Sequence, residues 1–227
     1  MSAALCQVFD LGRIDYGRAE RLQQRLVAQR RAGEAPDRLL ICEHDPVVTV
    51  GAGSEQPEAE MAAARAAGVA ARCVTRGGRA TVHCPGQVVA YPILDLREHR
   101  TDLHWYLRAL EDTIIDALAD LGCAAGRVAG HTGVWVAGHK IASIGVAVRG
   151  WVTYHGLSVN VRCDPALWRL VNPCGLEPEQ IASLADLQPA APSRCEMTCA
   201  LIVAFGRRFR LRTQQCAPAE LLARTVF

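Results

Sequence analysis

The chain of 227 residues contains a single lysine, Lys140, and every other member of its 25 Lys and Arg residues is arginine. Arginine serves as well as lysine in surface charge, salt bridges and phosphate contacts, but it does not give up its proton in a protein. A lysine at one position only therefore indicates chemistry that needs a titratable amine. The simpler interpretation is a solvated lysine at a turn with no chemical role.

One of the ten cysteines differs from the others in its setting. Cys174 lies in the sequence Asn172-Pro173-Cys174-Gly175. Proline fixes its own backbone and keeps the preceding residue extended, and Gly175 removes steric bulk directly after the thiol. Such a turn can present a thiol at the edge of a cavity, so Cys174 is the candidate nucleophile.

Cys174 and Lys140 together could catalyse acyl transfer. A free thiol titrates near ~8.5, so little thiolate exists at neutral pH unless a cation or hydrogen bonds stabilise it. A nearby ammonium would do so, and partial burial would let the same amine take up a proton. The thiolate could then accept an acyl group from a thioester without ATP and pass it to an amine that Lys140 deprotonates. Backbone amides near Gly145 or Gly175 could stabilise the oxyanion.

A glycine-rich stretch over residues 76–87 ends at a predicted strand. Paired glycines adopt conformations closed to other residues and let a ligand approach the main chain, so we expect a binding loop across a sheet. The Walker and dinucleotide-binding glycine motifs are absent. A tight hairpin without a ligand is the alternative, and His83 alone is more typical of a structural histidine than of a base.

Composition restricts the class of protein. Half of the residues are hydrophobic and 21% are charged, which is typical of a globular domain, and 227 residues suffice for one continuous core. The net charge of +2 predicts no strong attraction to nucleic acid. The N-terminal sequence has no secretory-signal pattern and no apolar run is long enough for a bilayer, so we expect a cytoplasmic protein.

The remaining cysteines are expected to be reduced thiols in a chain of this length. Zinc is not favoured, because Cys195 and Cys199 are spaced for one helical face and no second Cys/His pair accompanies them. Six cysteines among apolar neighbours are predicted to fill the core: Cys6, Cys42, Cys73, Cys123, Cys163 and Cys216.

Hydrophobic periodicity and turn residues predict the secondary structure. The expected helices are 16–31, 58–67, 103–121, 178–187 and 194–209. The expected strands are 38–43, 47–50, 69–75, 88–94, 133–136, 141–148 and 151–161. The last three strands read as an antiparallel meander with Lys140 at a strand end, which favours an α+β fold over a doubly wound one.

Several motifs in order along the chain resemble the octanoyltransferases of lipoate biosynthesis, from about residue 43 to residue 175. They comprise residues 76–87, 91–96, 132–136, 140–145, 155–157 and 172–175. The resemblance implies one catalytic domain over residues 1–227 with the α+β fold of the biotin/lipoate protein ligases, a mixed, largely antiparallel sheet with helices packed on it. It implies no cofactor and no metal.

The resemblance also implies roles for individual residues. Cys174 would carry the acyl thioester, and Lys140 would lower the pKa of that thiol and act as general acid and base. The implied acyl pocket is lined by Arg76, Gly77, Gly78, Arg79, Ala80, Thr81, Val82, His83, Ser143, Ile144, Gly145, Gly156, Leu157 and Ser158. Its glycines and small residues would give room for an eight-carbon chain.

The implied donor is an octanoyl group on the phosphopantetheine of acyl carrier protein. The implied acceptors are lysines on lipoyl domains of 2-oxoacid dehydrogenases and on the glycine cleavage H protein. Carrier proteins are typically acidic, so we expect a docking patch of arginines. Its candidates are Arg76, Arg79, Arg149 and Arg162.

Three positions depart from the family pattern. Val82 replaces an aromatic residue and Cys84 a glycine, and both are expected to border the pocket. Ala52-Gly53 replaces the usual Gly-Arg of the first loop, which removes one expected positive contact.

Other functions stay open at this stage. An ATP-dependent lipoate or biotin ligase would share the fold and need no cysteine nucleophile. A non-catalytic binding module would leave Cys174 in the core and Lys140 on the surface. A cysteine hydrolase would pair Cys174 with His83 or His155 and use water as the acceptor.

Overall fold

The computed structural model of the protein describes residues 3–171 and 178–222. A mixed sheet of eight strands has the order β11-β1-β2-β6-β10-β9-β8-β7, and a smaller sheet has the order β4-β3-β5. The strands of the large sheet are β1 (Ala4–Arg13), β2 (Asp37–Glu43), β6 (Gln87–Ile93), β7 (Gly126–Val128), β8 (His131–Val136), β9 (His139–Arg149), β10 (Val152–Asn160) and β11 (Leu211–Gln215). Those of the small sheet are β3 (Val47–Val50), β4 (Ala70–Cys73) and β5 (Ala80–His83).

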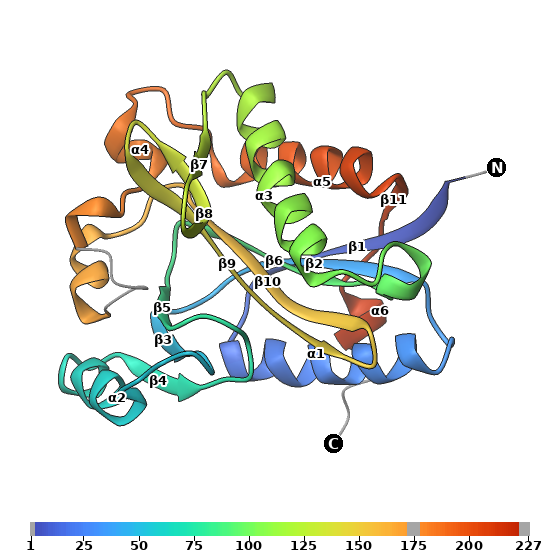
Figure 1. The fold of residues 1–227 in the computed structure, drawn as a ribbon, viewed down its shortest axis with the longest axis horizontal. Coiled ribbons are helices and arrows are strands. Elements are labelled where there is room, and N and C mark those ends of the chain that lie inside the picture. The colour runs from blue at the N-terminus through green and yellow to red at the C-terminus, as the bar shows by residue number, and fades with distance from the viewer. Residues whose placement is uncertain (1–2, 172–177, 223–227) are drawn as a thin grey trace.

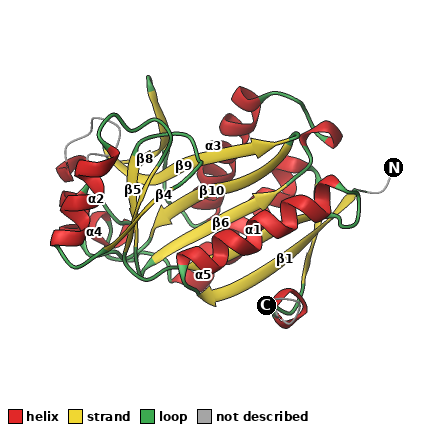
Figure 2. Ribbon diagram, turned by 90° about the horizontal axis from the view of Figure 1, so that it is seen from below, coloured by secondary structure: helices red, strands yellow, loops and turns green. Residues whose placement is uncertain are grey.

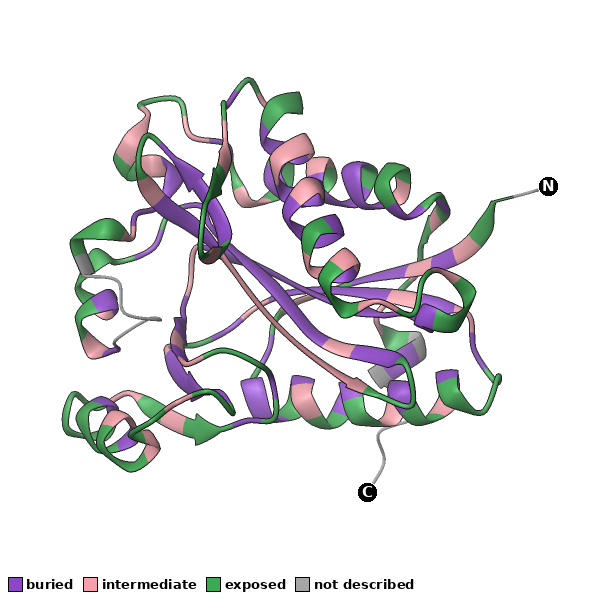
Figure 3. Cartoon of the chain, in the orientation of Figure 1, coloured by how far each residue is buried: buried purple, intermediate pink, exposed green. Residues whose placement is uncertain are grey.

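Helices cover both faces of the large sheet (Figures 1 and 2). The α-helices are α1 (Tyr16–Arg31), α2 (Pro57–Ala66), α3 (Leu103–Asp120), α4 (Leu184–Leu187), α5 (Arg194–Phe209) and α6 (Ala219–Leu222). Short 3-10 turns are η1 (Leu96–Glu98), η2 (Pro165–Leu170) and η3 (Pro178–Gln180). Helices α3 and α5 pack on one face and α1 on the other, so two hydrophobic clusters enclose the sheet. Strands β2 and β6 contribute side chains to both clusters and are largely buried (Figure 3).

The long helices begin at side-chain caps that the sequence shows. The side chain of Asp15 accepts a hydrogen bond from the Arg18 amide at the start of α1, and that of Asp102 accepts one from the Trp105 amide at the start of α3. Ser193 and Glu196 form a reciprocal capping box at the start of α5. The predicted helices 16–31 and 194–209 are confirmed, and 103–121 ends one residue early.

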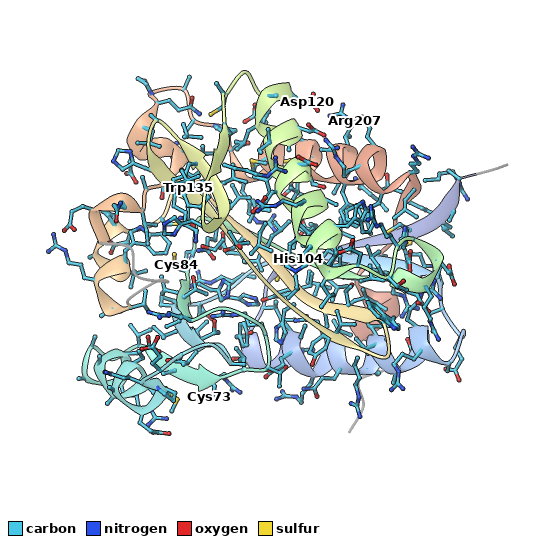
Figure 4. The ribbon with its side chains drawn as sticks, viewed as in Figure 1. Cys73, Cys84, His104, Asp120, Trp135 and Arg207 are labelled. Carbon is cyan, nitrogen blue, oxygen red and sulfur yellow. The ribbon has the colours of Figure 1, made fainter. Side chains whose placement is uncertain are left out.

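Helices α3 and α5 lie side by side and are joined by packing and by ion pairs. The apolar positions of α3 at Leu110 and Ile114 are fully buried. At the outer edge, Arg207 of α5 donates a hydrogen bond to Asp120 of α3 over 2.6 Å (Figure 4). Within the described residues, no helix is long and apolar enough to span a membrane.

The prediction of one helix over residues 178–187 is wrong. Ile181 instead forms a parallel β-bridge with Lys140, and the Ala182 amide donates to the Lys140 carbonyl over 3.1 Å. This bridge interrupts the segment after η3, and a new helix, α4, begins only after Ser183, whose capping box with Asp186 satisfies its first amides.

The sequence also failed to predict four strands, β1, β5, β7 and β11. Strand β1 lies between β11 and β2 and pairs in parallel with both, so the sheet is mixed rather than a pure meander. Strand β5 lies inside the stretch expected to be a loop, because residues 80–83 pair antiparallel with β3. These runs are short or lack regular alternation. Partners distant in sequence make β1, β5 and β11 strands, whereas β7 pairs with β8, the next strand along the chain.

The cysteine predictions are confirmed in part. Cys6, Cys42, Cys123 and Cys163 are buried, but Cys73 is exposed and Cys216 is half-buried. Cys73 ends β4, an edge strand of the small sheet, which explains its exposure (Figure 4). All nine cysteines of the described residues are free thiols.

The packing of α3 predicts a difference between two leucines on that helix. Leu110 is fully buried whereas Leu103 is 43% exposed. Replacing Leu110 by alanine should lower the free energy of unfolding by about 2–5 kcal/mol, because a cavity forms in the core. Leu103→Ala is the matched control and should change it by less than about 0.5 kcal/mol. Urea denaturation measures both, and similar losses would contradict this packing.

Candidate active site

A cavity of about 380 Å³ lies between β9 and β10 of the large sheet and the loop that leads into β5. Its volume is within the ~300–1,000 Å³ typical of small-molecule sites. Backbone hydrogen bonds define one wall, since the Gly77 amide donates to the Val146 carbonyl of β9 over 2.9 Å. The residues 130–132 at the start of β8 border the cavity as well.

Lys140 lines this cavity near the start of β9. The residue is only 6% exposed, although lysine is rarely buried. Its Nζ atom lies 5.4 Å from the ring centroid of Trp135, its partner in the β8–β9 register (Figure 4). The binding-module alternative placed Lys140 on the surface, and that prediction is therefore wrong.

Arg76 is buried and holds the loops of the cavity wall together. Its guanidinium donates to the carbonyls of Thr49, Gly77 and Arg79 over 2.6, 3.0 and 2.8 Å, and to the Thr49 hydroxyl over 2.9 Å. An arginine committed to backbone carbonyls inside the protein cannot serve as a docking group on the surface. Arg76 is therefore not part of the predicted docking patch of arginines. Arg79, another member of that patch, forms an ion pair with Glu55.

The glycines around the cavity serve mainly the close approach of one chain segment to another. A Cβ atom on Gly145 would lie 2.8 Å from Cδ of Arg76 and 3.1 Å from the Gly77 carbonyl. A Cβ on Gly51 would lie 2.3 Å from the Gly78 carbonyl, so the loop that follows β3 lies directly against the loop that leads into β5. At these two positions, the small residues make room for backbone and for Arg76 rather than for an acyl chain.

His83 is a neutral hydrogen-bonding residue of the cavity wall. Burial lowers its pKa from 6.5 to about 3, and His44 and Arg76 add to this effect. Its Nδ1 lies 3.0 Å from Oε1 of Gln87, whose amide group donates to the Asn160 side chain and to the Val82 carbonyl. Because Gln87 Nε2 is the donor in both bonds, Oε1 is the acceptor and His83 carries its proton on Nδ1.

His155 also lines the cavity, in a strained conformation. Its φ is +55° and its amide donates to Gln23 Oε1 over 2.7 Å. Burial, and Arg76 to a smaller extent, lowers its pKa to about 4. Its Nδ1 atom has no hydrogen-bond partner within the described residues. Histidines with such low pKa values are poor general bases near neutral pH, which counts against the hydrolase alternative.

Most of the pocket residues implied by the resemblance border the cavity. They are Arg76, Gly77, Gly78, Arg79, Ala80, Thr81, His83, Ser143, Ile144, Gly145, Gly156, Leu157 and Ser158. Val82 does not, because its side chain is buried between the small sheet and η2. Cys84 is buried in the same cluster, so neither substitution alters the wall directly. The predicted nucleophile Cys174 lies outside the described residues.

Other lining residues had no distinct signal in the sequence. Tyr16 opens α1, and Leu107 lies within the helix predicted over residues 103–121. Tyr91 and Thr132 stand in motifs quoted above, but those motifs gave them no role. Only the packing of distant segments places all four beside the same cavity. In the part of the chain that the structure describes, no group of three or more His, Cys, Asp and Glu residues could hold a metal ion.

The arrangement of these sheets and helices is similar to that of solved lipoate and biotin protein ligases. The chain resembles a lipoate protein ligase from Thermoplasma acidophilum with a TM-score of 0.77 at 17% identity, over 97% of this chain and 90% of that one. It also resembles the biotin protein ligase of Aquifex aeolicus, with a TM-score of 0.55 at 13% identity over 90% and 70%. Likeness at these identities defines the fold class.

Sequence comparison then defines the family. The profile described as "Lipoyl protein ligase A/B catalytic domain" matches residues 15–206. The octanoyltransferase of Thermosynechococcus vestitus is 42% identical over 220 residues, which is 95% of each chain. That of Solibacter usitatus is 46% identical over 184 residues, 80% of this chain and 83% of its own. The chain belongs to the lipoyl protein ligase A/B family and, within it, to the octanoyltransferases.

The low pKa of His83 predicts how stability depends on pH. Unfolding restores the ordinary value near 6.5, so the unfolded chain binds more protons below that pH and the free energy of unfolding falls as the pH decreases toward about 3. From pH 7 to pH 5, His83 alone should remove about 2 kcal/mol. Its contribution should be fully present above pH 6.5.

The test compares His83→Asn with His104→Gln by urea denaturation at pH 7 and pH 5. Asparagine keeps a donor toward Gln87 but does not titrate, so the pH dependence should become shallower in His83→Asn. His104 is exposed on α3 (Figure 4), and its variant should keep the slope of the unmodified protein. Equal slopes in both variants would show that His83 is not the group responsible.

Proposed function

We propose that this octanoyltransferase moves an octanoyl group from a thioester of acyl carrier protein to a lysine of a lipoyl domain, through a thioester on Cys174. The observation that carries the proposal is the position of Lys140, a nearly buried amine in the wall of a 380 Å³ cavity and the only lysine of the chain. The identity of the acyl group as octanoyl follows from the membership of the chain in the octanoyltransferases.

The described residues on either side of Cys174 support its place at this cavity. Val171, three residues earlier, is buried in the cluster that contains Ala80 of the cavity wall. Ile181, seven residues later, is bridged to Lys140 itself.

The first half-reaction exchanges one thioester for another. Lys140 takes the proton of the Cys174 thiol, and the resulting thiolate attacks the carbonyl carbon of the donor thioester. The C–S bond to the phosphopantetheine breaks, and its sulfur leaves with the proton of the Lys140 ammonium. One thioester breaks and one forms, so the step needs no ATP. The ammonium also stabilises the thiolate before attack, because opposite charges attract strongly in a shielded site.

The second half-reaction makes the amide. The neutral amine of the acceptor lysine attacks the acyl carbon on Cys174, and Lys140 takes the proton that the nitrogen loses. Cys174 then leaves as a thiolate beside the Lys140 ammonium, so the starting ion pair is restored. An arginine at position 140 could stabilise the thiolate but could not take part in either proton transfer.

The acceptor and donor follow from different arguments. The similar lipoate protein ligase of Thermoplasma acidophilum belongs to an archaeal lipoylation system together with its E2 lipoyl domain, which supports a lipoyl domain as the acceptor. Lipoyl domains of 2-oxoacid dehydrogenases and the glycine cleavage H protein are the proposed acceptors here. Acyl carrier protein is the proposed donor, and residues 1–227 are proposed to act as one catalytic domain without a cofactor.

Intact-mass analysis after mixing with octanoyl-carrier protein, in the absence of ATP, tests the intermediate. The unmodified protein should gain one octanoyl group that hydroxylamine removes, and Cys174→Ala should gain none. Cys73→Ala is the matched control, because that exposed thiol lies on β4. Lys140→Arg should form the adduct roughly 10²–10⁴-fold more slowly, as expected for the loss of a general acid and base.

Two outcomes would contradict the proposal. Transfer to a lipoyl domain by a protein that never carries an acyl group would exclude the Cys174 thioester. Transfer that requires ATP and free octanoate, and survives Cys174→Ala, would indicate an ATP-dependent ligase on the same fold.

A further inference from the structure

Two residues of β8 lie against the side chain of Lys140, and Gly133 is the first. A Cβ atom at this position would lie 2.7 Å from Cε and 3.4 Å from Nζ of Lys140. The φ of Gly133 is +137°, a conformation that residues with a side chain rarely adopt. The main chain of β8 therefore lies directly against the end of the lysine side chain, and only glycine permits that approach.

Trp135 is the second neighbour and belongs to the same strand. Its indole is 7% exposed and its ring centroid lies 5.4 Å from Nζ. An ammonium within about 6 Å of an aromatic face is attracted by the ring, more strongly where water is excluded. Gly133 and Trp135 thus both lie against Lys140 from β8, and Trp135 does so as the residue paired with Lys140 across the two strands.

Glu111 connects this contact to the helical layer. The residue is fully buried on α3, and its Oε1 accepts a hydrogen bond from the Gly133 amide over 3.1 Å. Its other oxygen, Oε2, accepts from Arg108 over 2.7 Å and from Arg127 over 2.5 Å. The two arginines compensate the buried charge, and the remaining oxygen fixes the backbone that touches Lys140.

We propose that Glu111, Gly133 and Trp135 are positioning residues for Lys140. They form a clamp in which Glu111 fixes Gly133, Gly133 limits where Cε and Nζ can lie, and Trp135 attracts the ammonium. A lysine side chain has many rotamers, and ordering it costs entropy, so a catalytic amine needs neighbours that hold it in one place. The importance of the clamp for catalysis rests on the proposed function, whereas its existence does not.

The single lysine makes the clamp directly measurable. In protein grown with lysine labelled with ¹³C at Cε, one side-chain signal arises from the whole chain, and it reports Lys140. The indole should displace this signal from the position of free lysine through its ring current. Trp135→Phe should reduce the displacement and Trp135→Leu should abolish it. Trp105→Phe, which alters a tryptophan packed against Phe209, is the control and should leave the signal unchanged.

The role of Glu111 is tested by the Lys140 signal, because Glu111 acts on Lys140 only through Gly133. Glu111→Gln has one oxygen for both Gly133 and the arginines, so the Lys140 signal should shift or broaden. Asp112→Asn is the matched control, because Asp112 pairs with the same Arg127 but does not bond to Gly133. Gly133→Ala should move the lysine, because its Cβ would lie 2.7 Å from Cε of Lys140 and 2.5 Å from the Ala142 carbonyl of β9.

Kinetics separate positioning from general destabilisation. Trp135→Leu and Glu111→Gln should lower kcat for octanoyl transfer by roughly 10–100-fold with little change in the KM of the donor, because only the placement of the amine is lost. An unchanged Lys140 signal in folded Trp135→Leu, or unchanged kcat in both variants, would overturn the proposal. If Lys140→Arg proves fully active, the proposed role of the lysine fails, while the signal still decides whether the clamp exists.

Discussion

The constraint on which this site depends is an amine kept almost entirely out of water. An unpaired buried charge is strongly unfavourable, so a lysine that is 6% exposed requires neighbours that compensate for the lost hydration. An aromatic face lies within reach of the ammonium, and the strand that carries Lys140 is bonded to the segment after residue 177. The same neighbours that make the burial tolerable also determine where the amine can act.

The cavity next to this amine is built from loops held by buried polar groups. Arg76 binds the Thr49 carbonyl of β3 and two carbonyls of its own loop, and Gly51 and Gly145 allow the loop after β3, the loop before β5 and β9 to lie against one another. A polar chain runs from His83 through Gln87 and Asn160 to the Ala182 carbonyl, beside the strand that carries Lys140. Buried polar groups are stable only when they are paired, so this network favours one arrangement of the wall.

The fold alone does not decide which chemistry takes place. Ligases of the same architecture appear among the solved structures at 13–17% identity, and a fold can host several reactions. Family membership and the buried lysine favour acyl transfer between a thiol and an amine. The low pKa values of His83 and His155 are consistent with this, since both histidines are neutral hydrogen-bonding groups near neutral pH.

The sequence by itself determined the long helices, the central strands and the two chemical candidates. Caps and apolar periodicity are local, so helices 16–31 and 194–209 could be predicted with their boundaries, and the uniqueness of Lys140 is visible in the composition. Tertiary structure decided the rest. Strands β1 and β11 exist because they pair with distant partners, and the residues 178–187 are broken by the bridge between Ile181 and Lys140. The roles of Arg76 and Glu111 depend on contacts across 16 or more residues, and no local pattern encodes such contacts.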